Sequence, residues 1–339
     1  MIVALGEATP TGKKQLAIGN STVRACWCGN TALEPFAPAY AKCLRCQTLV
    51  SQVKTNSNPE AVGTDEEGLY GRDYWFGHQA GFGHPNIVER SRSDLTERCI
   101  HWLRTTLKYR LPAVSLLELG CAHGGFVGLA KAAGYQATGL DLSPWMVDYA
   151  RHAFGVLTLV GPVQNQTMLL PGSLDIIAMM DVVEHLPDPV GTLKHCLSLL
   201  EPDGLFILQT PALPENQTLA QLDASQHKFP RHLKPAEHLY LFSKQSMREL
   251  FVQIGCPHVY FEKAMFDFYD QFCVASRVPL TPNSPEVVAD HLMGLGLSGR
   301  MVLAMLDLQE RNVALAAEKK YAQLKLRALE AGSQPVIPD

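Results

Sequence analysis

A stretch from Ser115 to Ser143 carries the residue types that bind an adenosine-containing cofactor. Its turn holds Gly120, and Asp141 follows about 20 residues later, at the end of a second apolar run. Glycines in a turn let the backbone approach a ligand closely, and a carboxylate can accept hydrogen bonds from both hydroxyls of a ribose. The stretch therefore predicts a nucleoside-binding turn followed by a ribose acceptor.

The turn departs from the pattern that binds a dinucleotide. The next glycine of that pattern, two residues after Gly120, is replaced by Ala122, and His123 follows. Glu118 stands just before the turn, where its charge would repel a phosphate group. A cofactor with an ammonium group and no phosphate fits these residues better than a dinucleotide does.

The elements that position these residues form a strand–helix–strand unit. We expect a buried strand that ends at Glu118, a helix over about 124–133 and a second strand over about 136–140. Gly134 suits the end of the helix, because glycine adopts the left-handed conformation at little cost. Strands that alternate with helices indicate an α/β sheet that binds its ligands at the carboxyl ends of the strands.

Four ordered segments resemble motifs of the class I methyltransferases that use S-adenosylmethionine (SAM). ELGCAHG and GLDLS resemble their first two motifs, and LDIIAMMDVVEHLPDP and LEPDGLFILQTP resemble their fourth- and fifth-strand motifs. The resemblance covers about 70–278 and implies an α/β fold with a Rossmann-like seven-stranded sheet. It also implies that Glu118 orients the methionine end of the cofactor, that Gly120 packs against it and that Asp141 holds the ribose.

The region expected to hold adenine lacks the acid that relatives often carry after the third strand. Here the residues after that strand run from Gly161 to Gln164, so backbone groups or Gln164 would have to bind the base. A Rossmann-like domain that uses another nucleotide is the alternative. The residues expected at the cofactor are Glu118, Gly120, Cys121, Ala122, Gly124, Asp141, Leu142, Gln164, Asp181 and Tyr74.

Two close cysteine pairs near the N-terminus predict a metal site. Cys26 and Cys28 precede Cys43 and Cys46 by about 15 residues, a spacing typical of a structural zinc site with four thiolates. The first pair is C-x-C rather than C-x-x-C, so a degenerate ribbon with free thiols is the alternative. The other cysteines are expected in the core or at the cofactor turn: Cys99, Cys121, Cys196, Cys256 and Cys273.

The order of parts is similar to that of bacterial methyltransferases of sugar and glycan biosynthesis. These have a cysteine ribbon, an aromatic segment like that at 70–75 (YGRDYW), and then the SAM domain. The histidine of their Y-x-E-H motif is a candidate base; Glu237 and His238 match this motif in kind, whereas Pro235 replaces its tyrosine. Those enzymes carry a further domain of well over 100 residues, whereas only about 60 residues follow Leu280 here.

Methyl transfer to a hydroxyl or an enolisable carbon needs a base, and histidine suits this task near neutral pH. His185 follows the predicted fourth strand, at the edge of the sheet where the methyl group should point. His238 closes a long insertion at 211–236, whose own histidines are expected to be solvated. We predict His238 and His185 as catalytic residues, with Glu237 and Tyr240 beside them. Packing roles are the alternative.

Composition excludes several classes of function. The chain has 339 residues, of which 47% are hydrophobic and 18% charged, with a net charge of −4, so it lacks the basic footprint of a nucleic-acid-binding protein. No run reaches the length of a membrane span and the N-terminus does not resemble a signal peptide. We therefore expect a cytoplasmic globular protein whose partner is a small molecule, neither a nucleic acid nor a membrane.

The expected organisation has four parts. They are a disordered tail (1–20), a zinc-ribbon-like module (21–55), a methyltransferase domain (70–280) and a C-terminal helical segment (284–331) through which a homodimer can form. The predicted function is methylation of a sugar or glycosylated small molecule at oxygen or carbon. The alternatives are O- or N-methylation of a non-sugar small molecule, and a SAM-binding scaffold without catalytic activity.

Overall fold

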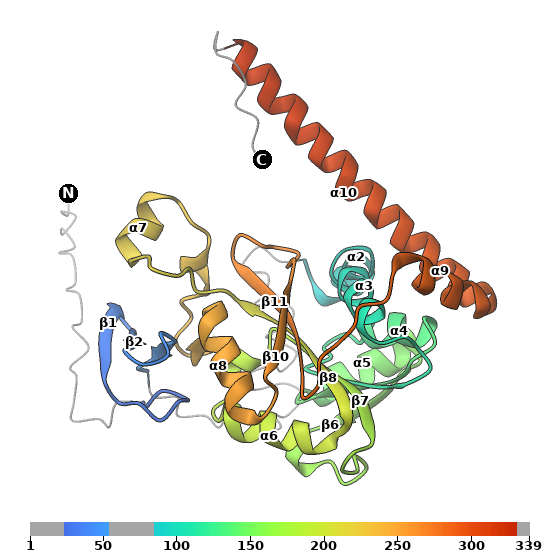
Figure 1. The fold of residues 1–339 in the computed structure, drawn as a ribbon, viewed down its shortest axis with the longest axis horizontal. Helices are drawn as coiled ribbons and strands as arrows, with labels where there is room; N and C mark the ends of the chain where they lie inside the picture. The colour runs from blue at the N-terminus through green and yellow to red at the C-terminus, as the bar shows by residue number, and fades with distance from the viewer. Residues whose placement is uncertain (1–23, 54–84, 331–339) are drawn as a thin grey trace, which may run out of the picture.

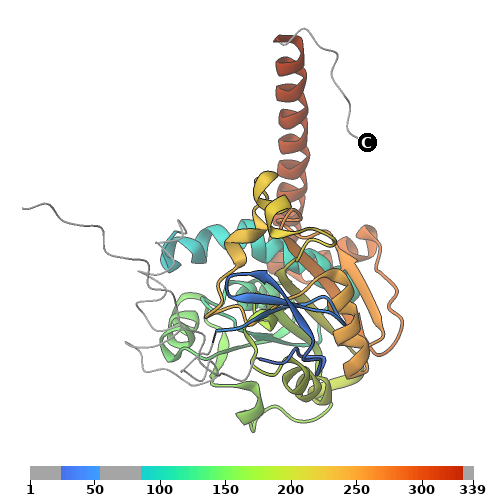
Figure 2. The same cartoon turned by 90° about the vertical axis from the view of Figure 1, so that its left-hand side faces the viewer.

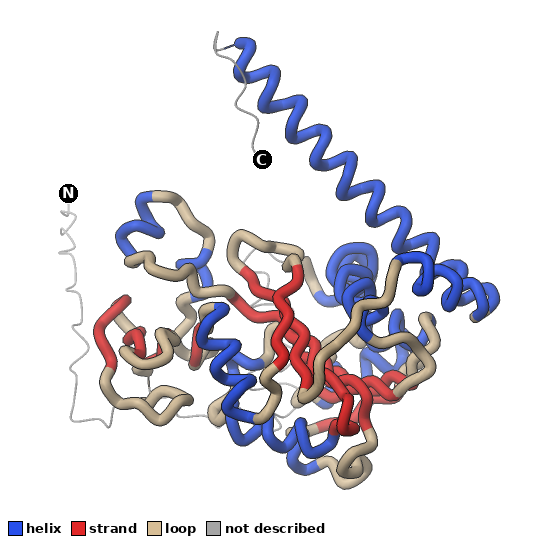
Figure 3. Tube along the Cα trace, viewed as in Figure 1, coloured by secondary structure: helices blue, strands red, loops and turns tan. Residues whose placement is uncertain are grey.

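The computed structural model describes residues 24–53 and 85–330. The expected tail at 1–20 and the aromatic segment at 70–75 lie outside the described residues. Within the described ranges, a seven-stranded sheet is covered by helices on both faces (Figures 1 and 3). Across this sheet the strands are β10 (His258–Glu262), β11 (Asp270–Ser276), β8 (Leu200–Pro211), β7 (Leu174–Met180), β4 (Ser115–Leu119), β5 (Gln136–Asp141) and β6 (Leu157–Val160).

The strand order confirms the predicted Rossmann-like methyltransferase sheet. The strands from β8 to β6 pair in parallel, whereas β11 is antiparallel to both β8 and β10. Strand β7 is buried almost throughout, which explains why its sequence, LDIIAMM, shows no alternation of polar and apolar residues. The parallel strands all end at one edge, and this edge positions the candidate site.

Helices pack on the two faces of the sheet in two separate cores. One face is covered by α3 (Ile100–Tyr109), α4 (Gly125–Ala132) and α5 (Pro144–Phe154), and α2 (Ile87–Asp94) packs against α4. The other face is covered by α6 (Pro189–Leu199) and α8 (Lys244–Ile254).

The predicted helix starts are confirmed at side chains that cap them. Ser143, Asp188 and Asn86 each accept hydrogen bonds from backbone N–H groups in the first turn of their helices. The single helix expected from Asn86 to Lys108 is divided by a π-helical turn, η2 (Leu95–Cys99). This turn changes the direction in which the following side chains point, and it lies beside the candidate site.

A second, four-stranded sheet joins the N-terminal part of the chain to the methyltransferase-like part. Its strands are β1 (Leu33–Ala37), β2 (Tyr40–Cys43), β3 (Leu49–Ser51) and β9 (Tyr240–Leu241), in that order. We call residues 24–53 the cysteine module. Because β9 pairs with β3, a segment about 190 residues further along the chain completes the sheet of this module.

The insertion expected at 211–236 is folded rather than an irregular loop. It contains α7 (Leu219–Ala224) and a 3-10 turn, η5 (Phe229–His232). Leu222 and Phe229 are fully buried against apolar residues of β2, β3 and β9. The insertion therefore packs on the cysteine module.

The C-terminal segment forms the two predicted helices, α9 (Pro285–Gly294) and α10 (Gly296–Glu330). Only the beginning of α10 packs on the body, through Val302 and Leu306, and the rest projects away from it (Figures 1 and 2). Side chains at 310–326 are exposed. The homodimer expected through these helices stays a prediction. Among the described residues, no helix combines the length and the apolar character that a membrane span requires.

Candidate functional site

A cavity of about 340 Å³ lies at the carboxyl ends of β4, β5 and β7. Glu118 and Asp141 line one end of it, which we call the cofactor end. His185 and His238 line the other, which we call the acceptor end. The volume lies in the range of ordinary small-molecule sites, and the edge is the one at which α/β sheets bind their ligands.

The turn after β4 requires residues that tolerate a left-handed backbone. Gly120 has φ of +69°, and a Cβ atom placed there would lie 2.6 Å from the Val182 side chain. Gly124 has φ of +78° and begins α4. Ala122, which replaces the expected glycine, also adopts a positive φ, of 43°. The turn thus keeps the shape that glycine usually provides.

Asp141 is fixed by two backbone groups. Its Oδ2 accepts the N–H of Ala122 at 2.9 Å, and its Oδ1 accepts the N–H of Ser143 at 2.9 Å. Burial raises the pKa of this carboxyl, while the N–H groups of Ser143 and Ala122 oppose the change. Each oxygen keeps a second lone pair, so the carboxylate can accept both hydroxyls of a ribose.

Glu118 has a buried oxygen without a partner among the described residues. The side chain lines the cavity, and its Oε2 makes no hydrogen bond there. Burial raises the pKa of Glu118 well above its usual value, and the negative charge of Asp141 raises it further. An ammonium group at this end would satisfy the orphaned oxygen and compensate the buried charge. Both acids therefore fit a cofactor that carries a ribose and an ammonium group.

Apart from Gly124, the other predicted cofactor residues that the structure describes also line the cavity. Gln164 differs in orientation, because one of its two side-chain N–H groups is donated to Thr192 Oγ1 at 3.0 Å, which leaves the second N–H and the oxygen for a ligand. Tyr74 lies outside the described residues. The cavity is also lined by Gly120, Cys121, Ala122, Leu142 and Asp181. Gly124 does not line it and instead packs closely against α5.

At the acceptor end, two histidines have their tautomers fixed by backbone carbonyls. His185 Nδ1 lies 3.0 Å from the Glu237 carbonyl oxygen, and His238 Nδ1 lies 2.7 Å from that of His232. A carbonyl oxygen only accepts, so each Nδ1 carries the proton and donates it. In the neutral rings Nε2 then carries the lone pair.

Burial keeps these rings neutral. It lowers the pKa of His185 to about 4 and that of His238 well below its usual value, and the neighbouring His185 lowers the latter further. The ring centres of the two histidines are 4.9 Å apart in an edge-to-face arrangement. One ligand atom from each of Glu184, His185 and His238 lies within 4.8 Å of the others. The acceptor end thus presents two neutral imidazoles beside a buried carboxyl.

Comparisons with known proteins agree with this geometry. A family model described as a methyltransferase domain matches residues 91–259. Residues 91–259 form a class I SAM-dependent methyltransferase domain.

Two curated relatives of this domain are ubiquinone biosynthesis O-methyltransferases. The protein from Actinobacillus pleuropneumoniae serotype 7 is 33% identical over 142 residues, which are 36% of this chain and 60% of that protein. The protein from Xanthomonas campestris pv. campestris is 37% identical over 106 residues, 30% of this chain and 44% of that protein. The chain therefore spans less than two thirds of either relative. Neither name refers to a sugar, unlike the resemblance expected from the sequence.

A solved SAM-dependent methyltransferase from Archaeoglobus fulgidus is 17% identical to this chain, with a TM-score of 0.46. The match covers 60% of this chain and 99% of that one. At this level of similarity the fold assignment rests on the strand order described above.

The other two predicted catalytic residues, Glu237 and Tyr240, differ in whether they line the cavity. Glu237 lines the cavity and supplies the carbonyl that holds His185. Tyr240 does not line it. This residue pairs with Val50 in the small sheet, and its side chain is buried beside Arg24 of the cysteine module. The catalytic role expected for Tyr240 is therefore corrected to a packing role, because alternation along β9 turns its side chain away from the cavity.

Sequence reasoning missed a hydrogen-bonded support beneath the cofactor turn. His123 accepts the Gly125 N–H at Nδ1, at 3.0 Å, so its Nε2 donates to Asp94, at 3.2 Å. Arg90 pairs with the same carboxylate at 3.1 Å. This chain of contacts ties the turn to α2, which accounts for a histidine in a turn of small residues. No local pattern connects Asp94 with His123.

Three further residues of the acceptor end were also missed. His232, expected in solvent, lies against Tyr269 with ring centres 5.0 Å apart, and both line the cavity. Asp270 lies at the start of β11, where burial and the charge of Asp181 raise its pKa to about 9. They come from the insertion and from the final hairpin, and neither segment carries a motif that points to the site.

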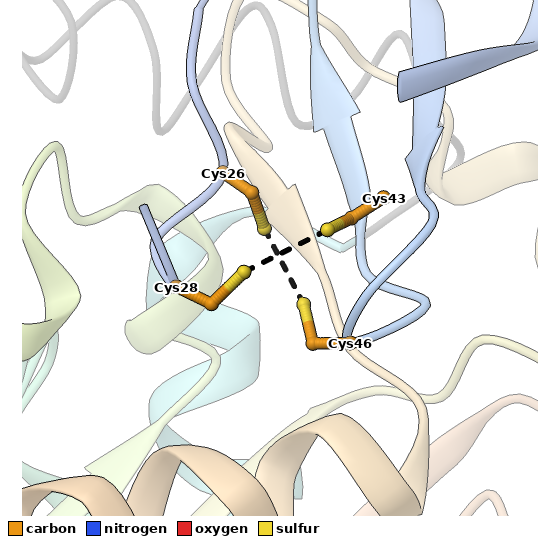
Figure 4. A group of neighbouring side chains, drawn as sticks. All are labelled: Cys26, Cys28, Cys43 and Cys46. Carbon is orange, nitrogen blue, oxygen red and sulfur yellow. Dashed lines mark hydrogen bonds between the residues drawn. The ribbon is translucent and has the colours of Figure 1, made fainter. Parts of the chain in front are cut away.

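The predicted cysteine cluster is present in the cysteine module. All four sulfur atoms lie within 4.8 Å of one another and point to a common centre (Figure 4). Cys26 and Cys46 are 3.4 Å apart at sulfur, and Cys28 and Cys43 are 3.7 Å apart. Tetrahedral zinc with bonds of about 2.3 Å to sulfur separates its ligands by roughly 3.8 Å, so the arrangement fits this ion.

The short C-x-C spacing is accommodated by Gly29. This residue has φ of +80°, and its N–H donates to the Cys26 carbonyl at 2.8 Å, which closes the loop around the first pair. The Asn30 side chain donates to Cys43 Sγ at 3.3 Å. Such contacts orient thiolates around a metal, and the short spacing is accommodated by a backbone conformation that glycine adopts readily.

Proposed function

We propose that this protein transfers the methyl group of SAM to a hydroxyl oxygen of a small-molecule acceptor, with a histidine as the base. One observation carries the proposal: a single cavity joins Glu118 and Asp141 to the paired imidazoles of His185 and His238. A ligand held at the two acids can therefore reach the histidines with its far end.

The cofactor end would hold SAM through its charge and its ribose. Asp141 would accept the ribose hydroxyls, and Glu118 would accept the ammonium group at its orphaned Oε2. Ala122 and Ser143 keep the Asp141 carboxylate oriented before the cofactor arrives. SAM supplies an activated methyl group, so these residues chiefly align it.

The acceptor end would receive the proton. As the acceptor oxygen bonds to the methyl carbon, the bond from that carbon to sulfur breaks and the sulfonium becomes a neutral thioether. The hydroxyl proton passes to Nε2 of His238 or His185, whose lone pairs are set by the carbonyls at Nδ1. We favour His238 as the base, because hydrogen bonds from the cysteine module and to the turn after β7 hold the peptide around it.

The acceptor is proposed to contain a ring with a free hydroxyl. The rings of His232 and Tyr269 line this end, and aromatic side chains pack favourably against flat rings. The names of the curated relatives support oxygen as the methylated atom. A sugar-linked acceptor is the second candidate, because the apolar face of a sugar ring can pack on the same side chains.

We propose that the cysteine cluster binds one structural zinc ion. Four thiolates fill the tetrahedral positions, so no open position remains for chemistry. Metal analysis of the purified protein should find one zinc per chain. A folded protein that contains no metal would contradict this assignment.

The proposed activity can be tested with SAM that carries a labelled methyl group. The acceptor panel should contain a catechol, a simple phenol, a nucleotide-linked sugar and an amine, each with and without a chelator. We expect methylation of a ring hydroxyl that is insensitive to the chelator over a short incubation. Binding of SAM with no methylated product would favour the scaffold alternative, and immediate loss of turnover with chelator would favour an ion at Glu184, His185 and His238.

A further inference from the structure

We infer that Tyr40 and Ser51 of the cysteine module are positioning residues for His238, so that the metal-binding module controls the acceptor end of the cavity. The inference rests on the proposed role of His238 as base. It follows from contacts between segments that lie 184 to 198 residues apart, beginning with the hydrogen bond from the Tyr40 hydroxyl to the His238 carbonyl.

The two positioning residues lie opposite each other on one hairpin. Strands β2 and β3 are antiparallel, and Tyr40 pairs with Ser51 at the open end of the hairpin. At the other end, Cys43 is the last residue of β2 and Cys46 lies in the connection to β3. The hairpin therefore links the cysteine cluster to the His238 segment across about three residue pairs, or roughly 10 Å.

Tyr40 holds the main chain of His238 directly. Its hydroxyl donates to the His238 carbonyl oxygen at 2.8 Å, and the Tyr40 side chain is only 2% exposed. Burial raises the pKa of Tyr40, so the hydroxyl keeps its proton and remains a donor. A buried carbonyl that lost this partner would be left unsatisfied, which favours a shift of the segment.

Ser51 holds the residues on both sides of His238. Its N–H donates to the Leu239 carbonyl at 2.9 Å, and its hydroxyl donates to the Pro235 carbonyl at 2.6 Å. The opposite side of the segment is held by a 3-10 turn after β7, η4 (Val183–His185), because the Leu239 N–H donates to the Glu184 carbonyl at 2.7 Å. The peptide around His238 is thus held between the cysteine module and η4.

These contacts matter because the two histidine rings depend on the same short peptide. The Glu237 carbonyl fixes the tautomer of His185, and His238 itself follows directly. A shift of this peptide would move both Nε2 atoms relative to the methyl group. Misplacement by about 1 Å is enough to slow an aligned reaction strongly.

The first experiment compares Tyr40→Phe with a matched control, Tyr135→Phe. Tyr135 is also buried, and its hydroxyl also donates to a backbone carbonyl, that of Arg110 at 2.5 Å, outside the cavity lining. We expect Tyr40→Phe to lower kcat about tenfold, with unchanged affinity for SAM, and to shift the acidic limb of the pH profile of kcat. Tyr135→Phe should change neither. Equal kcat values and equal profiles in the two variants would overturn the inference.

A second measurement separates this inference from the proposed function. Nitrogen NMR of ¹⁵N-histidine-labelled protein reports which ring nitrogen of His238 carries the proton, without any need for turnover. In the wild type we expect the proton on Nδ1, and in the double variant Tyr40→Phe/Ser51→Ala a mixture of tautomers. An unchanged His238 signal in the double variant would contradict the positioning role. A wild type that methylates no acceptor would contradict only the proposed function.

Discussion

The two ends of the cavity are built in different ways. At the cofactor end, Glu118, the turn and Asp141 come from one strand–helix–strand unit, and local hydrogen bonds hold them. At the acceptor end, His185 and His238 come from separate segments and depend on contacts with the insertion and the cysteine module. Substitutions at the first end should therefore affect SAM binding, and substitutions at the second should affect turnover.

Replacement of His238 should give the largest difference between the effect on turnover and the effect on SAM binding. His238→Ala removes the proposed base, so we expect kcat to fall by roughly 10²–10⁴-fold. The affinity for SAM should stay within about twofold, because no contact of the cofactor end is lost. The exposed His152 offers a control, and His152→Ala should leave both quantities unchanged. Normal turnover by His238→Ala would remove this residue as the base.

Replacement of Asp141 tests the opposite end. Asp141→Ala removes the acceptor of two ribose hydroxyls, each worth about 1.5 kcal/mol or more when the acceptor is charged, so the affinity for SAM should fall about 100-fold. Calorimetry measures this directly. Asp175 serves as a control, because it also accepts a backbone N–H, from Ser115, but does not line the cavity. Unchanged affinity in Asp141→Ala would refute the assignment of the cofactor end.

Loss of the cysteine cluster should affect the acceptor end only, and so lower turnover with little change in SAM affinity. The double variant Cys43→Ser/Cys46→Ser should lose its zinc and lower kcat about tenfold, since the hairpin that holds His238 loses its closed end. The affinity for SAM should change less than about threefold. Cys256→Ser, a buried cysteine outside the cluster, is the control. Equal losses of SAM affinity and kcat would mean that the module supports the whole domain rather than one end.

The smallest expected effect is a proton released when SAM binds. Burial raises the pKa of Glu118 well above its usual value, which favours the protonated carboxyl in the free protein. The cofactor ammonium favours the carboxylate, so binding should release the proton, and the affinity for SAM should rise with pH. Calorimetry in buffers of different ionisation enthalpy measures the release. Glu118→Gln should abolish it, and a release equal to that of the wild type would exclude Glu118 as the source.

The same contrast explains what the sequence can predict. The turn, Asp141 and the capped helices were predictable, because each depends on neighbours within about 20 residues. The cysteine cluster was predictable from spacing alone. The support of His123 by Asp94, and the packing of His232 on Tyr269, depend on tertiary contacts that leave no local pattern.

Tyr240 shows most clearly what cannot be predicted from the local sequence. Its position two residues after His238 suggested a shared site, but the strand that contains it pairs with the cysteine module and turns the side chain away. Local sequence gave no sign that a strand of two residues would form there, because its partner, β3, lies far away in the chain. The sequence therefore pointed to the two histidines of the acceptor end, whereas the contacts that build this end are visible only in the fold.

A crystal structure with bound S-adenosylhomocysteine would test the central claim most directly. The claim is that one ligand spans the cavity, with its ribose on Asp141 and its sulfur facing His185 and His238. We predict hydrogen bonds from both ribose hydroxyls to Asp141, the amino group beside Glu118 and the sulfur directed towards the acceptor end. A ribose bound away from Asp141, or a sulfur directed away from the histidines, would contradict the account.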